Sequence, residues 1–253
     1  MTLFNLIGFI STVALAIPII ASLATKLSWY KSFPALFFYY LIIFSYNLFL
    51  LGYINTDGNF KYYHGVFNNV LDTPLILTFF LYFSTTPAFR KKLQFTILSF
   101  IVFEIIILAV FGFTAKATTI ILAPGLVLTL VISLMVFMHQ VKIAVENHKA
   151  IGKALMSASL LFAYVGYCFV YSVFYLMKTT NKEDAFIVFF LITIFSSVIM
   201  SAGIFLERKR VQQLLELQTT REELKAIYGE EETKKMANTF GAAIVNFDKE
   251  PWN

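Results

Sequence analysis

The sequence predicts an all-α polytopic membrane protein, a seven-transmembrane-helix bundle with a short cytoplasmic C-terminal helix. Three observations support this fold class. Hydrophobic residues make up 58% of the 253-residue chain and charged residues only 14%, whereas soluble domains average about 45–50% and about 25%. Seven apolar runs are each long enough to cross a bilayer, which takes about 20 helical residues. The basic residues between these runs gather on one side of the predicted bundle.

The predicted spans are apolar runs that end at polar clusters. The first run starts at residue 3 and is longer than the apolar region of a signal peptide, so we expect it to be retained as a helix. Pro18, Pro74 and Pro124 fall inside spans, where neighbouring helices can satisfy the backbone groups that a proline leaves free. The predicted helices cover residues 3–25, 33–54, 67–86, 93–114, 117–139, 151–177 and 185–206.

The sixth and seventh spans carry small residues at four-residue spacing, such as Ser159 with Ala163 and Ser197 with Ser201. Small side chains on one helical face allow two helices to approach closely within a membrane. We therefore expect these two spans to pack against each other.

After Leu206 the chain becomes rich in charged residues, which predicts two parts: a transmembrane domain at residues 1–206 and a cytoplasmic helical tail at residues 207–253. Apolar residues of the tail fall at heptad positions, in a partial coiled-coil pattern that Arg221 interrupts. This pattern predicts a helix that binds a cytoplasmic protein or a second copy of the chain. The expected contact residues are Leu214, Leu217, Leu224 and Tyr228.

The basic residues of the loops predict the orientation. With the N-terminus outside, eleven Lys and Arg face the cytoplasm and four face the other side, a bias typical of cytoplasmic loops. This orientation depends on the short connection at residues 115 and 116, because a re-entrant pair there would reverse the later helices. We expect a plasma or inner membrane, and we expect the basic clusters to contact lipid headgroups. These residues are Arg90, Lys91, Lys92, Arg208, Lys209 and Arg210.

Several classes of function lack their sequence signals. No clustered basic face with interleaved aromatic residues is present, so no nucleic-acid partner is expected. The single cysteine, Cys168, cannot form a disulfide or a thiolate cluster. The histidines lie at or beyond the ends of the predicted spans, which argues against a haem or a zinc site. We predict no cofactor, no metal and no enzymatic activity.

Glu104 lies near the middle of the predicted fourth span, where an ionised side chain costs at least about 2.5–3.5 kcal/mol. No Lys or Arg lies deep enough in a predicted span to neutralise it. Two interpretations stay open. Glu104 is either a neutral acid that hydrogen-bonds a neighbouring helix, or a proton or amine site that faces a polar cavity.

Asp72 lies about one turn into the predicted third span, beside Asn69 and Thr73 and before Pro74. A carboxylate near the interface can cap a helix or support a turn before a proline. The alternative is that Asp72 and Asn69 form the mouth of an outward-facing pocket that attracts a cation or an amine.

Tyrosines repeat at helical spacing in two predicted spans. Four phenols of the sixth span share one face: Tyr164, Tyr167, Tyr171 and Tyr175. Deep phenols need hydrogen-bond partners, and they either pack between helices or line a ligand cavity. The candidate ligand or proton site therefore comprises Glu104, Asp72, Asn69, Tyr46, Asn47, Tyr167 and Tyr171.

Three functions are compatible with these features. The first is a receptor-like signalling module, in which an outward cavity with aromatic and carboxylate side chains is coupled through the seventh helix to the cytoplasmic helix. The second is a transporter or channel that uses Glu104 and Asp72 as proton-coupling or cation-coupling groups. The third is an accessory or assembly protein without a ligand, which acts through its tail.

Overall fold

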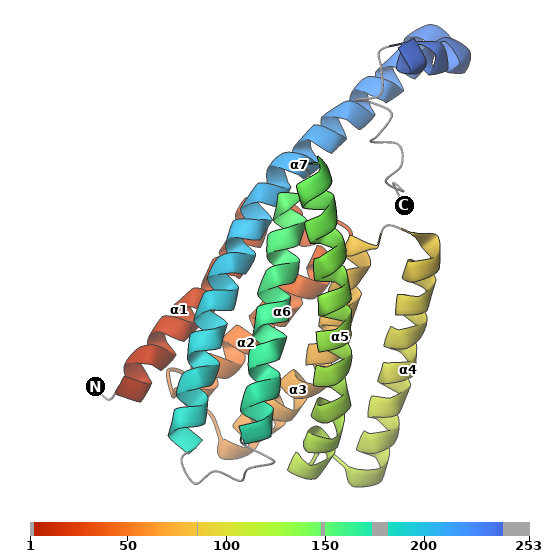
Figure 1. Cartoon of the computed structure of the whole chain (residues 1–253). Helices are drawn as coiled ribbons and strands as arrows, with labels where there is room; N and C mark the ends of the chain where they lie inside the picture. Colours follow the sequence, from red (N-terminus) through yellow and green to blue (C-terminus); the bar gives the residue numbers. More distant parts are fainter. Residues whose placement is uncertain (1–2, 85, 148–149, 174–181, 240–253) are drawn as a thin grey trace.

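The computed structural model describes residues 3–84, 86–147, 150–173 and 182–239 (Figure 1). Every regular element in these ranges is helical, and seven helices are long and apolar enough to cross a membrane. The predicted all-helical class and number of spans are confirmed at this level. The elements are α1 (Leu3–Ala24), η1 (Leu27–Trp29), α2 (Phe33–Leu50), α3 (Gly58–Phe80), η2 (Leu81–Phe83), α4 (Pro87–Phe111), α5 (Ala115–Asn147), α6 (Ile151–Tyr171) and α7 (Lys182–Thr239), where η marks a short 3-10 helix.

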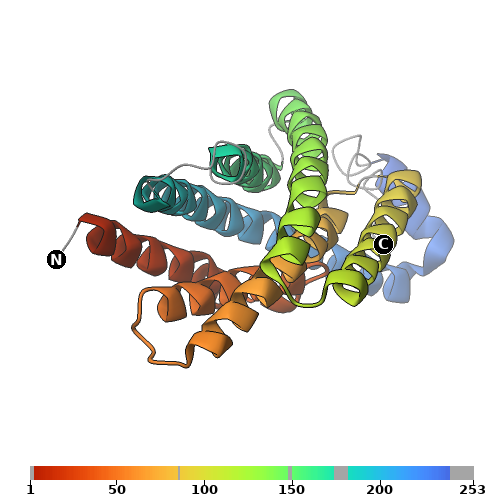
Figure 2. The same ribbon diagram turned by 90° about the horizontal axis from the view of Figure 1, so that it is seen from below.

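Six of the helices form a closed ring. Each helix in the order α1, α2, α3, α5, α6 and α7 packs against the next, and α7 packs back against α1. α4 lies outside this ring, against α3 and α5 (Figure 2). We call the end of the bundle that holds Leu3 the N-terminal end, and the end where α7 leaves the bundle the exit end (Figure 1).

The peripheral helix α4 exposes large apolar side chains. Phe95, Leu98, Ile105 and Val110 are each at least 60% exposed. Apolar patches of this extent are rare on monomeric proteins in water. A hydrocarbon solvent removes their cost, as long as the helix satisfies its own backbone groups.

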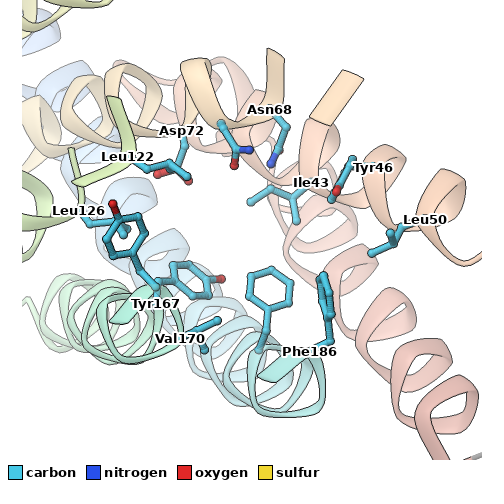
Figure 3. Close-up of a pocket in the computed structure, with 13 residues that line it drawn as sticks. Ile43, Tyr46, Leu50, Asn68, Asp72, Leu122, Leu126, Tyr167, Val170 and Phe186 are labelled. Atoms are coloured by element: carbon cyan, nitrogen blue, oxygen red, sulfur yellow. The ribbon is translucent and has the colours of Figure 1, made fainter. Parts of the chain in front are cut away.

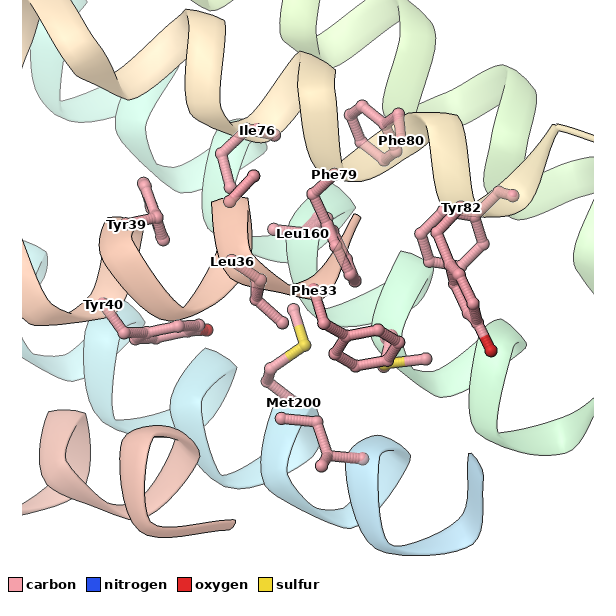
Figure 4. Close-up of a cluster of buried hydrophobic side chains, with 14 of the residues drawn as sticks. Phe33, Leu36, Tyr39, Tyr40, Ile76, Phe79, Phe80, Tyr82, Leu160 and Met200 are labelled. Carbon is pink, nitrogen blue, oxygen red and sulfur yellow. The ribbon is translucent and has the colours of Figure 1, made fainter. Parts of the chain in front are cut away.

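The ring interior near the exit end is filled by aromatic and aliphatic side chains (Figure 4). Phe33 at the start of α2 and Phe79 near the end of α3 are fully buried and meet edge to face, with ring centroids 5.4 Å apart. Leu160 of α6 and Met200 of α7 complete the same cluster. This half of the ring is therefore a packed core.

Several helix ends differ from the predicted ones. α3 begins at Gly58 rather than at residue 67, and α5 continues to Asn147 rather than to residue 139. Both extensions mix polar and charged residues with apolar ones, so a search for apolar runs does not detect them. α4 begins at Pro87 rather than at residue 93, because the Thr86 side chain caps it by accepting a hydrogen bond from the Phe89 amide.

The connection between α4 and α5 is a tight turn between two separate helices that run in opposite directions (Figure 1). Gly112 follows α4 with φ at 65°, in the left-handed region that favours glycine. Thr114 then caps α5 by accepting a hydrogen bond from the Ala117 amide at 3.2 Å. The structure therefore contains two full-length helices here and no re-entrant pair.

α7 is one helix from Lys182 to Thr239, and no break marks residue 206. The predicted transmembrane domain and tail thus share one continuous element, which projects beyond the exit end of the bundle (Figure 1). Continuity follows from the sequence, because residues 200–239 contain only two glycines and no proline. Residues 240–253 lie outside the described ranges.

α6 and α7 approach each other most closely through small residues. A Cβ atom added to Gly152 of α6 would lie 2.6 Å from the Glu207 amide nitrogen of α7, and one added to Gly203 would lie 3.0 Å from the Gly152 carbonyl oxygen. The Ser159 hydroxyl donates a hydrogen bond of 2.7 Å to the Ser196 carbonyl across the same contact. The two spans pack as their small-residue spacing predicts.

The close contact between α6 and α7 predicts that a methyl group added at Gly152 destabilises the fold. We expect Gly152→Ala to lower the free energy of unfolding by about 1–3 kcal/mol, because the new Cβ meets backbone atoms of α7 that cannot move independently. Gly58→Ala is the matched control, since a Cβ added there meets nothing within 4 Å. Denaturation of both variants in detergent measures the difference, and equal stabilities would contradict the close contact.

Candidate functional site

A cavity of about 260 Å³ lies inside the ring, in the half nearer the N-terminal end (Figure 3). Side chains of α2, α3, α5, α6 and α7 line it. Its polar lining consists of Tyr46, Asn68, Asn69, Asp72, Tyr167 and Tyr171. Its apolar lining consists of Ile43, Leu50, Leu122, Leu126, Val170, Phe186 and Phe189. The volume is at the small end for a ligand site, since such pockets usually measure about 300–1,000 Å³.

Helical periodicity brings these residues to one place. Asn68 and Asp72 are one turn apart on α3, as are Tyr167 and Tyr171 on α6, so each pair faces the same side of its helix. Tyr46 of α2 reaches the cavity beside Gly65 of α3, where a Cβ would lie 3.1 Å from the tyrosine ring. A glycine at this position leaves room for the ring.

Asp72 is the charged residue of the cavity lining. Its Oδ2 atom accepts a hydrogen bond of 2.9 Å from the phenol of Tyr164, which is fully buried. A hydrogen bond from a phenol to an ionised carboxylate is stronger than one between neutral groups. No Lys, Arg or His is among the residues that the structure places along the cavity wall.

Tyrosines surround Asp72 on its inner side. Tyr39 and Tyr40 of α2 are buried, with ring centroids 5.2 Å apart, and both lie near Tyr167. The Tyr167 ring is stacked on Phe189 of α7 at 5.3 Å. The tyrosines therefore serve both as packing between helices and as cavity wall.

The structure brings together five of the seven residues predicted for the ligand or proton site. Asp72, Asn69, Tyr46, Tyr167 and Tyr171 all line the cavity. The remaining two, Asn47 and Glu104, are not part of its wall.

Asn47 is fully buried in α2, and neither of its amide atoms has a hydrogen-bond partner in the described part of the chain. Successive residues of a helix point about 100° apart. The structure turns Tyr46 toward the cavity, and Asn47 points to another side of α2, outside the cavity wall.

Glu104 is buried on α4, and its Oε1 atom has no hydrogen-bond partner among the described residues. One turn earlier, Phe100 packs against Gly125 of α5, so this face of α4 is turned toward the ring. Glu104 interacts electrostatically with Asp72. Glu104 and Asp72 therefore lie near each other, but of the two only Asp72 lines the cavity.

A second polar cluster lies at the exit end and joins η2, α6 and α7. The Tyr82 phenol donates a hydrogen bond to Oε1 of Glu207, which is fully buried. Arg210 forms a salt bridge of 2.6 Å with the same oxygen. The Lys153 ammonium lies 5.1 Å from the centre of the Tyr82 ring, within range of a cation–π interaction. Glu207 is thus held by Tyr82 from a distant part of the chain and by Arg210 of its own helix.

This cluster was not predicted from the sequence, which assigned Arg210 to lipid headgroups together with Arg208 and Lys209. The structure directs the Arg210 guanidinium to Glu207, whereas Lys209 is exposed. The sequence signal was an acid and a base three residues apart at the end of an apolar run. The other basic cluster, Arg90 to Lys92, is exposed at the start of α4.

The predicted contact residues of the tail fall into two groups. Leu214 is buried and Leu217 is half-buried, so the tail begins as a packed part of the bundle. The side chains of Leu224 and Tyr228 lie outside the described residues.

The residues that the structure places along the cavity wall include one carboxyl group and no His, Cys, Lys or Arg side chain. Within the ranges that the structure describes, no three His, Cys, Asp or Glu residues are grouped so that they could hold a metal ion.

Known families, characterised proteins and solved structures give no match to this chain. Its function therefore has to be inferred from the cavity and from the path of α7.

The buried Glu207 predicts unequal roles for two neighbouring basic residues. We expect Arg210→Ala to lower the free energy of unfolding by about 2–3 kcal/mol, because it leaves a buried carboxylate without its ion-pair partner. Lys209→Ala, at the exposed adjacent position, should change it by less than about 0.5 kcal/mol. Unfolding in detergent measures both values, and equal losses would show that Glu207 does not depend on Arg210.

Proposed function

We propose that the chain is a receptor-like signalling module of a membrane, in which ligand binding in the cavity is transmitted through α7 to a cytoplasmic helix. One observation carries this proposal. α7 contributes Phe186 and Phe189 to the cavity wall, and the same unbroken helix continues past the exit end to Thr239 (Figure 1). A ligand that contacts these rings therefore touches the element that leaves the bundle.

The basic residues at the exit end of the bundle support the proposed orientation. The exit end carries Arg90, Lys91 and Lys92 at the start of α4 and Lys209 on α7, all of them exposed. Clusters of this kind are typical of cytoplasmic faces, where anionic lipid headgroups attract them. With the exit end in the cytoplasm, the cavity belongs to the outer half of the bundle, as in a receptor at a plasma or inner membrane.

The packing of α7 supports transmission by movement of a whole helix. α7 lies between α1 and α6, and its contact with α6 runs from Ile192 against Gly166 to Glu207 against Gly152. Helices packed in this way shift by about 1–2 Å as rigid units. A shift at Phe189 is therefore expected to reach the exit end.

The Glu207 cluster supports two discrete positions for α7. The carboxylate is bonded to Tyr82 of η2 and to Arg210 on the next turn of its own helix. Rotation of α7 would separate Glu207 from Tyr82 and would need a new partner for the buried carboxylate. A buried charge that must be paired favours one arrangement over intermediate ones.

The tail is the proposed output. Val211 and Leu214 are buried, whereas the adjacent side chains of Gln212, Gln213 and Leu215 are exposed. This part of α7 is free of the bundle on one face and is expected to bind a cytoplasmic protein or a second copy of the chain. Partner choice would then depend on the position of α7.

A cavity-filling substitution tests the coupling without a known ligand. We expect Val170→Trp to displace α7, because Val170 lines the cavity and a larger side chain there occupies the space beside Phe186 and Phe189. Spin labels at Lys92→Cys and Gln213→Cys in a Cys168→Ser background report the displacement as a change of about 1–2 Å in the mean distance by double electron–electron resonance.

Val165→Trp is the matched control, since Val165 lies on the same helix but is 53% exposed and does not line the cavity. The control should leave the distance between the labels unchanged. Identical distances in the wild type, Val170→Trp and Val165→Trp would contradict the proposed coupling.

A further inference from the structure

In the described part of the chain, the cavity wall contains an acidic group and no basic group. Asp72 contributes a carboxylate, and the other polar groups along the wall are amides and phenols, which are neutral. Burying a carboxylate among apolar side chains is costly unless a counter-charge or several hydrogen-bond donors compensate it. Since no basic side chain is among the wall residues, the carboxyl group is neutral when the cavity is empty or is paired with a positive group of a bound molecule.

The carboxyl group of Asp72 has two oxygen atoms. Tyr164 donates its hydrogen bond to Oδ2, and Oδ1 is the other acceptor of this side chain. Asp72 and Asn68 both lie at the cavity in the close-up view, across from the rings of Tyr167 and Phe186 (Figure 3). The space between them thus has a negative group on one side and aromatic rings on the other.

Aromatic rings favour a cation at this place. The faces of phenylalanine and tyrosine rings attract positive charge, and the attraction is stronger where water is excluded. They also offer an apolar surface for an organic group. Phe186 and Phe189 lie one turn apart on α7, so they present two rings to the same ligand.

Other classes of ligand fit less well. A calcium ion takes 6–8 oxygen ligands and a magnesium ion demands octahedral geometry, whereas the cavity wall offers a single carboxylate and several apolar groups. An anion would be repelled by Asp72. A neutral molecule would gain no charge attraction from Asp72.

We propose that the ligand is a small organic ammonium ion, with its charged head at Asp72 and its apolar body against Phe186 and Phe189 of α7. The assignment rests on the receptor function proposed above and names the chemical class of its ligand. The head anchors the ion to α3, and the body presses on α7. The charged head would therefore provide the binding affinity, and the apolar body would displace α7.

Three probes of similar size and different charge test the class. We expect phenethylamine, a cation at neutral pH, to raise the thermal unfolding midpoint of the purified full-length chain in detergent in a saturable way. The neutral phenethyl alcohol and the anionic hydrocinnamate should have little effect. Asp72→Asn should weaken the apparent affinity for phenethylamine at least 10-fold, because it removes the charge that selects the amine.

Asp57→Asn is the matched control: it makes the same chemical change just before the first residue of the same helix, outside the cavity wall. It should retain the wild-type response. Phe186→Ala should weaken binding of phenethylamine but keep the preference for the amine over the alcohol. This variant and the wild type decide the question even if Asp72→Asn does not fold.

The ammonium assignment is overturned if phenethyl alcohol stabilises the chain as strongly as phenethylamine, or if none of the three probes stabilises it. An unchanged response in a folded Asp72→Asn variant overturns it as well. These outcomes differ from failure of the receptor function, because the displacement caused by Val170→Trp is measured without any ligand.

Discussion

The close contact between the backbones of α6 and α7 is the constraint on which the rest of the structure depends. Gly152 and Gly203 let the two helices approach until a single added Cβ would meet backbone atoms, and α1 supports α7 on its other side. Held in this way, α7 has little freedom except to move as one body. The cavity rings, the buried Glu207 and the tail all lie on that body.

Two acids lie in opposite halves of the bundle. Asp72 faces a cavity and is bonded to Tyr164, while Glu207 is enclosed and bonded to Tyr82 and Arg210. Buried charges add little to net stability, because their desolvation offsets most of their attraction. What they provide instead is a strong preference for particular partners. In the proposed mechanism, the first acid selects the ligand and the second fixes the position of α7.

The fold could be predicted from the sequence because apolar runs of about 20 residues leave few other structures possible. Helix ends were predicted less well, since the polar starts of α3 at Gly58 and of α4 at Pro87 carry capping and turn signals but no hydropathy signal. Asp72 and Asn69 could be singled out because polar groups are rare in such helices. Phe186 and Phe189 could not, because a phenylalanine facing a cavity looks like any other in an apolar helix. The pairing of Tyr82 with Glu207 joins residues far apart in the chain, which only the tertiary structure reveals.

The account requires the cavity and the tail to lie on opposite sides of one membrane, with α7 as the link between them. Labelling of intact cells with a membrane-impermeant maleimide tests this most directly, using Asn59→Cys and Gln213→Cys separately in a Cys168→Ser background, since both positions are exposed. The account predicts that the Asn59→Cys variant reacts in intact cells and that the Gln213→Cys variant reacts only after the membrane is permeabilised. Reaction of both variants in intact cells, or of Gln213→Cys alone, would contradict it.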